Sequence, residues 1–77
     1  MEMTVNVGEK YMHFKGNTYI VIAISQHEEG QQDDVVVYQA INTGTIYGKL
    51  LSVFCSPVDK VKYPACIQEM QFQRIYN

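Results

Sequence analysis

The segment of residues 8–24 limits the possible folds of this chain more than any other segment. Two apolar runs, residues 11–14 and 18–24, flank Lys15-Gly16-Asn17. Glycine and asparagine tolerate the left-handed backbone conformation that a tight turn requires, so the segment predicts a β-hairpin. The second run is apolar on both faces, which is typical of a central strand whose two faces are both at least partly covered.

The rest of the chain adds further strands. Those predicted are residues 35–41, 46–51 and 70–76, which are rich in β-branched and aromatic side chains or alternate in polarity. Residues 42–45, Asn-Thr-Gly-Thr, predict a second hairpin turn, and residues 25–34 contain no apolar side chain and predict a loop. Short strands separated by turns indicate a mainly β fold, namely a small antiparallel, SH3-like or related β-barrel of five to six short strands.

Three connecting segments are less regular. Residues 52–57 predict a single turn of 3₁₀ type that inserts Phe54 into the core. Residues 60–63 alternate charged and apolar side chains and predict a short strand that stops before Pro64. For residues 65–70 a helical turn stays open as an alternative, because alanine, glutamine, glutamate and methionine tolerate a helix.

Length and charge exclude several classes of protein. A chain of 77 residues is expected to form a single domain with a small core, since it buries only about 60% of its unfolded surface. A net charge of −2 argues against a non-specific nucleic-acid binder, although it is compatible with a local basic patch. With no signal peptide and no apolar window of ~18 residues, we expect a cytoplasmic protein that does not enter the membrane. Cys55 and Cys66 are then expected to be free thiols.

The first two thirds of the chain carry a family resemblance. The residues concerned are Gly8, Tyr11, His13-Phe14-Lys15-Gly16, Tyr19, Val21, Ala23, His27-Glu28, Val36-Val37-Tyr38, Leu51 and Phe54. In combination they resemble the small bacterial family catalogued as domain of unknown function 1653, over residues 8–58. That family typically has arginine at Met12 and Trp-Val-Arg-Pro at Tyr47-Gly48-Lys49-Leu50, and both differences weaken a cationic site. The resemblance implies a short β-rich domain with no established activity.

The hairpin registers follow from the lengths of the predicted turns. The three-residue turn of the first hairpin pairs His13 with Tyr19. The four-residue turn of the second hairpin pairs Tyr38 with Lys49. A two-residue turn in the first hairpin would set His13 beside Ile20, and it is disfavoured because it buries an imidazole without an obvious partner.

These registers divide the side chains into two faces. The face predicted to point toward the core consists of Met12, Phe14, Ile20, Ile22, Val35, Val37, Ile41, Ile46 and Leu50. The predicted binding residues on the opposite face are Tyr11, His13, Tyr19, Tyr38, Tyr47 and Lys49, with Lys15 at the turn. We expect a non-enzymatic binding module whose aromatic face holds a protein or peptide segment, or a short single-stranded nucleic acid or nucleotide that stacks on the rings.

Two functional alternatives stay open. The first is a small hydrolase or transferase that uses His13 and Glu28, and the second is an oligomerisation or strand-addition module that forms a homodimer. Cys55 could serve as a nucleophile beside His13 or His27, but no local motif supports it. The potential zinc ligands His13, His27, Cys55 and Cys66 match the spacing of no compact zinc module, so neither a metal nor a cofactor is expected.

Overall fold

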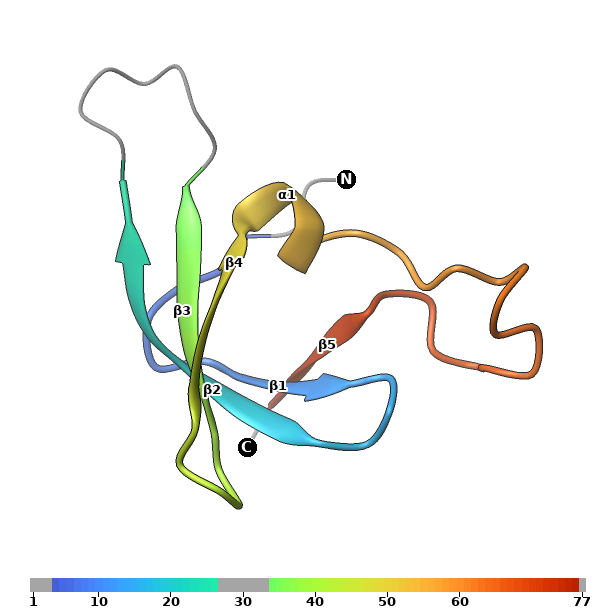
Figure 1. Ribbon diagram of the computed structural model, residues 1–77, viewed down its shortest axis with the longest axis horizontal. Helices are drawn as coiled ribbons and strands as arrows, with labels where there is room; N and C mark the ends of the chain where they lie inside the picture. The colour runs from blue at the N-terminus through green and yellow to red at the C-terminus, as the bar shows by residue number, and fades with distance from the viewer. Residues whose placement is uncertain (1–3, 27–33, 77) are drawn as a thin grey trace.

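The computed structural model describes residues 4–26 and 34–76, which form five strands and one helical turn (Figure 1). The strands are β1 (Lys10–His13), β2 (Thr18–Ser25), β3 (Val35–Ala40), β4 (Ile46–Leu50) and β5 (Phe72–Ile75), and the helical turn is α1 (Leu51–Phe54). All five strands belong to one antiparallel sheet in the order β4-β3-β2-β1-β5. The prediction of a mainly β, antiparallel fold is confirmed.

β2 bends in the middle and divides the sheet into two halves. Its pairing with β3 shifts register between Val21 and Ala23, and such a bulge bends a strand and increases its twist. In Figure 1, β2 continues beside β3 after this point, while β1 lies along its first half and β5 lies on the other side of β1. The two edge strands, β4 and β5, do not pair with each other in the described part of the chain, so the predicted barrel describes the fold only approximately.

The β1–β2 hairpin has a different register from the predicted one. Tyr11 pairs with Tyr19, and the His13 N–H donates to the Asn17 carbonyl at 2.8 Å, so the three-residue turn begins one residue earlier than predicted. Gly16 ends this turn with φ of +106°. A three-residue hairpin loop prefers glycine in this conformation at its last position. The predicted pairing of His13 with Tyr19 is therefore wrong.

The β3–β4 hairpin differs from its prediction in the same way. Tyr38 pairs with Tyr47 rather than with Lys49, and residues 41–44 form the turn. Gly44, at φ of +76°, again takes the last turn position. In each hairpin the cross-strand partner of a residue changes by two positions, and because side chains alternate with a period of two, this correction leaves the predicted faces unchanged. The bulge in β2 does change them, since beyond it Ile24 pairs with Val36 and packs against the core, while Ala23 pairs with Val37.

The two faces have the opposite roles from those predicted. The core cluster consists of Val5, Tyr11, Val21, Val36, Tyr38, Phe54 and Phe72, so the face that carries the tyrosines points inward. The rings of Phe54 and Phe72 stack at its centre, with 4.1 Å between centroids. Aromatic side chains bury especially large areas, which favours the tyrosine face as the inner one once the hydroxyl groups have partners.

The face predicted to be the core lies on the outer side of the sheet. Its exposed apolar side chains, with 37–58% of their surface accessible, are Met12, Ile22, Ile41, Ile46 and Leu50. The assignment of this face to the core is wrong because α1 brings Phe54 against Tyr11 and Tyr38 on the other side. Extended apolar surfaces are typical of contacts between proteins. Homodimer formation stays a prediction.

The helical turn begins one residue earlier than predicted, at Leu51–Phe54 instead of within residues 52–57. α1 buries Phe54 completely, which confirms the predicted insertion of this ring into the core. The N–H of Cys55 donates to the Leu51 carbonyl, four residues back, so the turn is of α rather than 3₁₀ type. Residues 65–70 contain no helix. No helix of the described residues is long and apolar enough to cross a membrane.

Residues 60–63 form turns and not the predicted strand. The Oδ1 atom of Asp59 accepts hydrogen bonds from the N–H groups of Val61 at 3.0 Å and Lys62 at 3.3 Å. The Tyr63 N–H donates to the Asp59 carbonyl. When an aspartate side chain accepts hydrogen bonds from the backbone N–H groups of the residues that follow it, these N–H groups are not available for strand pairing. Val61, predicted to point inward, is therefore 94% exposed.

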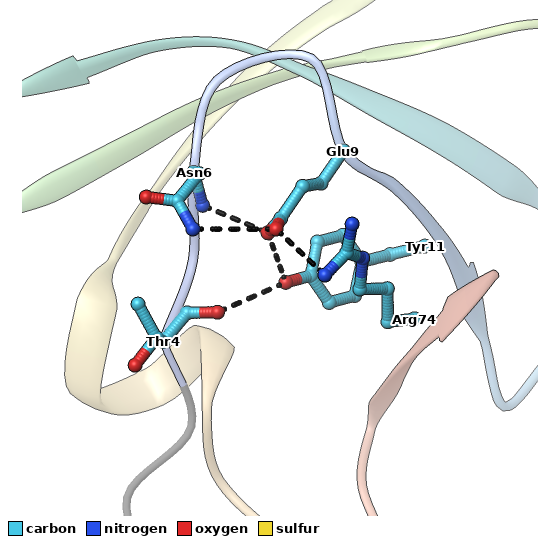
Figure 2. A network of polar contacts seen from close by, with 5 residues as sticks. All are labelled: Thr4, Asn6, Glu9, Tyr11 and Arg74. Carbon is cyan, nitrogen blue, oxygen red and sulfur yellow. Dashed lines mark hydrogen bonds and ion pairs between the residues drawn. The ribbon is translucent and has the colours of Figure 1, made fainter. Parts of the chain in front are cut away.

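A polar network joins the N-terminal segment to β1 and β5 (Figure 2). The Glu9 carboxylate accepts hydrogen bonds from the Asn6 N–H and the Tyr11 hydroxyl, both at 2.8 Å, and pairs with Arg74 at 3.0 Å. The Tyr11 hydroxyl also lies 3.5 Å from the Thr4 carbonyl. Burial and the bond to Glu9 raise the pKa of Tyr11, so its hydroxyl remains a donor. The network supplies the partners that a buried tyrosine requires.

Candidate functional site

The aromatic face continues from the core to an open end of the sheet. Tyr19 contacts Tyr38 edge to face at 5.2 Å between centroids, and Tyr38 stacks on Tyr47 at 5.6 Å. His13 contacts Phe72 at 4.9 Å and Tyr19 at 6.5 Å, both edge to face. Such pairs are each worth about 0.5–1.5 kcal/mol beyond the burial of area, so the rings hold one another in position.

Accessibility divides the predicted binding residues into two groups. Tyr11 and Tyr38 are 1% and 5% exposed and belong to the core, so the prediction that they face solvent is wrong. The residues that remain accessible are His13, Lys15, Tyr19, Tyr47 and Lys49, which we call the open end of the aromatic face. Tyr47 is 43% exposed, and it therefore offers a ring surface to a ligand.

Two lysines border this open end. The Lys49 Nζ atom, on β4, lies 5.2 Å from the centroid of the Phe72 ring. The Lys15 Nζ atom, in the β1–β2 turn, lies 5.8 Å from the Phe14 centroid and 5.6 Å from that of Tyr63. Cation–π contacts at exposed sites are worth about 0.5–1 kcal/mol. Such a contact orients the amine, and the amine keeps its positive charge. Among the described residues no carboxylate forms an ion pair with either lysine.

His13 lies within the electrostatic influence of both lysines. The backbone N–H of Lys15 donates to the Nδ1 atom of His13 at 3.2 Å, so Nε2 carries the proton of the neutral ring. Burial, together with the charges of Lys49 and Lys15, lowers the pKa of His13 below its usual value of about 6.5. The imidazole is therefore neutral at pH 7, and its Nε2–H is a hydrogen-bond donor.

We expect His13 to titrate below pH ~6.5 in the folded chain. The unfolded chain binds this proton more tightly, so the stability that His13 contributes is complete above pH ~6.5 and is lost as the pH falls through the folded pKa. An NMR pH series that follows the imidazole Cε1 proton measures the pKa of His13. A His13→Asn variant assigns the signal. Lys49→Gln should raise this pKa, because it removes a neighbouring charge, and an unchanged value would contradict the electrostatic origin of the shift.

The catalytic and metal alternatives involve residues that the structure does not describe. Glu28 and His27 lie outside the described residues, so the pairing of His13 with Glu28 stays a prediction. Within residues 4–26 and 34–76, no group of three or more histidine, cysteine, aspartate and glutamate side chains could hold a metal ion. No disulfide joins Cys55 to Cys66.

Sequence reasoning did not identify Phe72, Tyr63 and Lys62 as neighbours of the site. The segment after α1 folds back to the β1–β2 hairpin, where the Gln68 side-chain amide donates to the Met12 carbonyl at 3.1 Å. This contact spans 56 residues of sequence, and no local pattern signals it. Alternation along the predicted last strand could have identified Phe72 as an inward residue.

A cavity of about 690 Å³ between residues 6–10 and the end of β5 is a weaker candidate. Its charged groups include Glu9 and Arg74, which already pair with each other. The Glu9 carboxylate also accepts hydrogen bonds from Asn6 and Tyr11. These groups serve to hold the N-terminal segment in place, whereas the amines of the open end have no such partners among the described residues.

A family model covers most of the chain. It is described as "Protein of unknown function (DUF1653)" and matches residues 9–74. The match confirms the resemblance read from the sequence and extends it beyond residue 58 to β5, all of whose residues pair with β1. No curated protein and no solved structure matches the chain.

Proposed function

We propose that this chain, which belongs to the DUF1653 family of proteins of unknown function, is a non-enzymatic module that binds an anionic ligand at the open end of its aromatic face. The observation that carries the proposal is the convergence of Lys15 and Lys49 on a neutral His13, beside accessible aromatic rings. Neither amine pairs with a carboxylate of the described residues. An anion near both amines would gain the attraction of two positive charges.

The aromatic rings supply a second kind of contact. Tyr47 is exposed and Tyr19 is half-buried on the face that carries Lys49, and stacking of a base on an accessible ring is worth about 1–3 kcal/mol. A nucleotide, a short single strand or an acidic peptide segment fits this combination. The net charge of −2 does not oppose it, because salt screens charges beyond about 8–10 Å and leaves the local lysines dominant.

We take the fold to be SH3-like. The support for this is the meander of β1 to β4 with a bent β2, followed by one helical turn and by β5, which returns to pair with β1. SH3 domains hold their ligands in aromatic-lined grooves. A binding role without chemistry therefore agrees with both the architecture and the aromatic site, although architecture alone carries no function.

Replacing Lys49 with glutamine is expected to weaken anion binding about tenfold, the size of one lost charge-assisted hydrogen bond. Amide NMR titrations of the whole chain with a short oligothymidylate and with an acidic peptide measure the effect. Lys10→Gln is the matched control, because Lys10 is an exposed lysine on the outer face. Binding should also weaken as salt is added. Shift changes that avoid the open end, or equal losses in both variants, would refute the proposal.

A further inference from the structure

Two shallow pockets adjoin each other beside the β1–β2 turn. The first has a volume of about 320 Å³, and we call it the basic pocket. Its polar lining residues are His13, Lys15, Asp59, Lys62 and Gln71. The second, of about 490 Å³, has an apolar lining that includes Pro64, Ala65 and Ile67, and we call it the apolar pocket. The residues that line both are Phe14, Lys15 and Tyr63.

Positive charge exceeds negative charge in the basic pocket. Lys15 comes from the β1–β2 turn, and Lys62 comes from the segment that follows α1. The charge of Lys49 also reaches this pocket, since it helps to lower the pKa of His13, which lines the pocket. Asp59 also lines the pocket, but its Oδ1 atom already accepts hydrogen bonds from two backbone N–H groups. The pocket thus combines amines from different segments with a neutral imidazole and holds one carboxylate.

The apolar pocket suits a flat or apolar group. The Tyr63 ring meets the Phe14 ring edge to face at 4.8 Å, at the boundary between the two pockets. Ile67 is 96% exposed, so a group placed in this pocket would remove apolar surface from water. The amine of Lys15 lies at the same boundary, 5.6 Å from the centroid of the Tyr63 ring.

We infer that the ligand is a nucleoside monophosphate, with its phosphate in the basic pocket and its base in the apolar pocket. This inference rests on the proposed function, names the ligand class, and places the base in the apolar pocket instead of on the rings of Tyr47 and Tyr19. A phosphate monoester carries a charge of about −1.5 to −2 at pH 7 and three strong acceptor oxygens. Amines from two separate segments, Lys15 and Lys62, together with the His13 imidazole that lines the same pocket, match three oxygens better than the two of a carboxylate. A ligand that also fills the adjoining apolar pocket needs a ring, and inorganic phosphate has none.

The test is calorimetric titration of the whole chain with adenosine monophosphate, adenosine and inorganic phosphate. The nucleotide should bind at least about tenfold more tightly than either fragment, because only the nucleotide fills both pockets. Lys15→Gln should weaken the binding of nucleotide and of phosphate alike, by about tenfold. Tyr63→Leu should weaken the binding of the nucleotide more than that of phosphate, because the Tyr63 ring lines the apolar pocket as well as the basic one. The controls are Lys10→Gln and Tyr76→Leu, which change an exposed lysine and a 77% exposed tyrosine away from the pockets.

Amide spectra of the variants establish that each one is folded, and Lys62→Gln provides a second test of the basic pocket. A nucleotide that binds no more tightly than phosphate, or a Tyr63→Leu variant with unchanged nucleotide affinity, overturns the inference. Binding of an acidic peptide without nucleotide binding also overturns it, but leaves the proposed function intact. If no anionic probe binds at all, both the inference and the proposed function are wrong.

Discussion

Replacing Phe54 with alanine will lower the free energy of unfolding by about 3–5 kcal/mol, the cost of deleting a fully buried aromatic ring. Phe54 is 0% exposed, stacks on Phe72 at 4.1 Å and meets Tyr11 and Tyr38 edge to face at 5.2 and 5.5 Å. Small domains have total stabilities near the lower end of about 5–15 kcal/mol. A large part of the variant should therefore be unfolded without denaturant, as urea denaturation followed by circular dichroism will show.

The matched control for this variant is Val53→Ala. Val53 belongs to the same helical turn, but it is 42% exposed. Its replacement should change the unfolding free energy by no more than about 0.5 kcal/mol. Equal stabilities of the two variants would mean that α1 does not close the core. They would contradict the conclusion that the aromatic face of the sheet is its inner face.

Replacing Glu9 with alanine is expected to cost about 2 kcal/mol, because it removes the shared acceptor of several donors. The Asn6 N–H, the hydroxyl of the buried Tyr11 and the Arg74 guanidinium all contact this carboxylate, whose side chain is 9% exposed. Chemical denaturation measures the loss. Glu69→Ala, at an exposed glutamate, is the control and should stay within about 0.5 kcal/mol of the unchanged chain.

The same carboxylate makes stability dependent on acid. Desolvation by itself raises the pKa of Glu9, but hydrogen bonds from Asn6 and Tyr11 and the charge of Arg74 outweigh it and lower the pKa. The unfolded chain then binds the proton more tightly than the folded chain. The contribution of Glu9 is therefore complete above about pH 4.3 and is lost as the pH falls through the folded pKa. Glu9→Gln should flatten this part of the stability profile, and an unchanged acid profile would exclude Glu9 as its cause.

Local sequence patterns were sufficient to locate the five strands and, up to the bulge in β2, to sort their side chains into two faces, although they also predicted a strand over residues 60–63 that does not form. The strand predicted over residues 18–24 is β2, Thr18–Ser25, and the strand predicted over residues 46–51 is β4, Ile46–Leu50. Gly16 and Gly44 marked both hairpin turns, although each glycine ends its turn instead of lying inside it. These features depend on neighbours in sequence, which is why composition and alternation reveal them.

Tertiary structure alone decided which face is the core. Met12 and Ile20 are more apolar than Tyr11 and Tyr19, so hydrophobicity along the strands favoured the wrong face as the inner one. The choice is made by side chains that come from distant segments. Phe54 and Phe72 cover the tyrosine face, and Glu9, which pairs with Arg74, accepts the hydrogen bond of the Tyr11 hydroxyl.

The candidate site shows the same division between sequence and structure. The sequence grouped His13, Lys49 and the tyrosines on one face, and the structure keeps them together. The sequence could not show that Tyr11 and Tyr38 are buried, nor that Tyr63 lies against the β1–β2 turn. Burial and such long-range contacts depend on how the segment after α1 folds back onto the sheet, and no local pattern encodes that path.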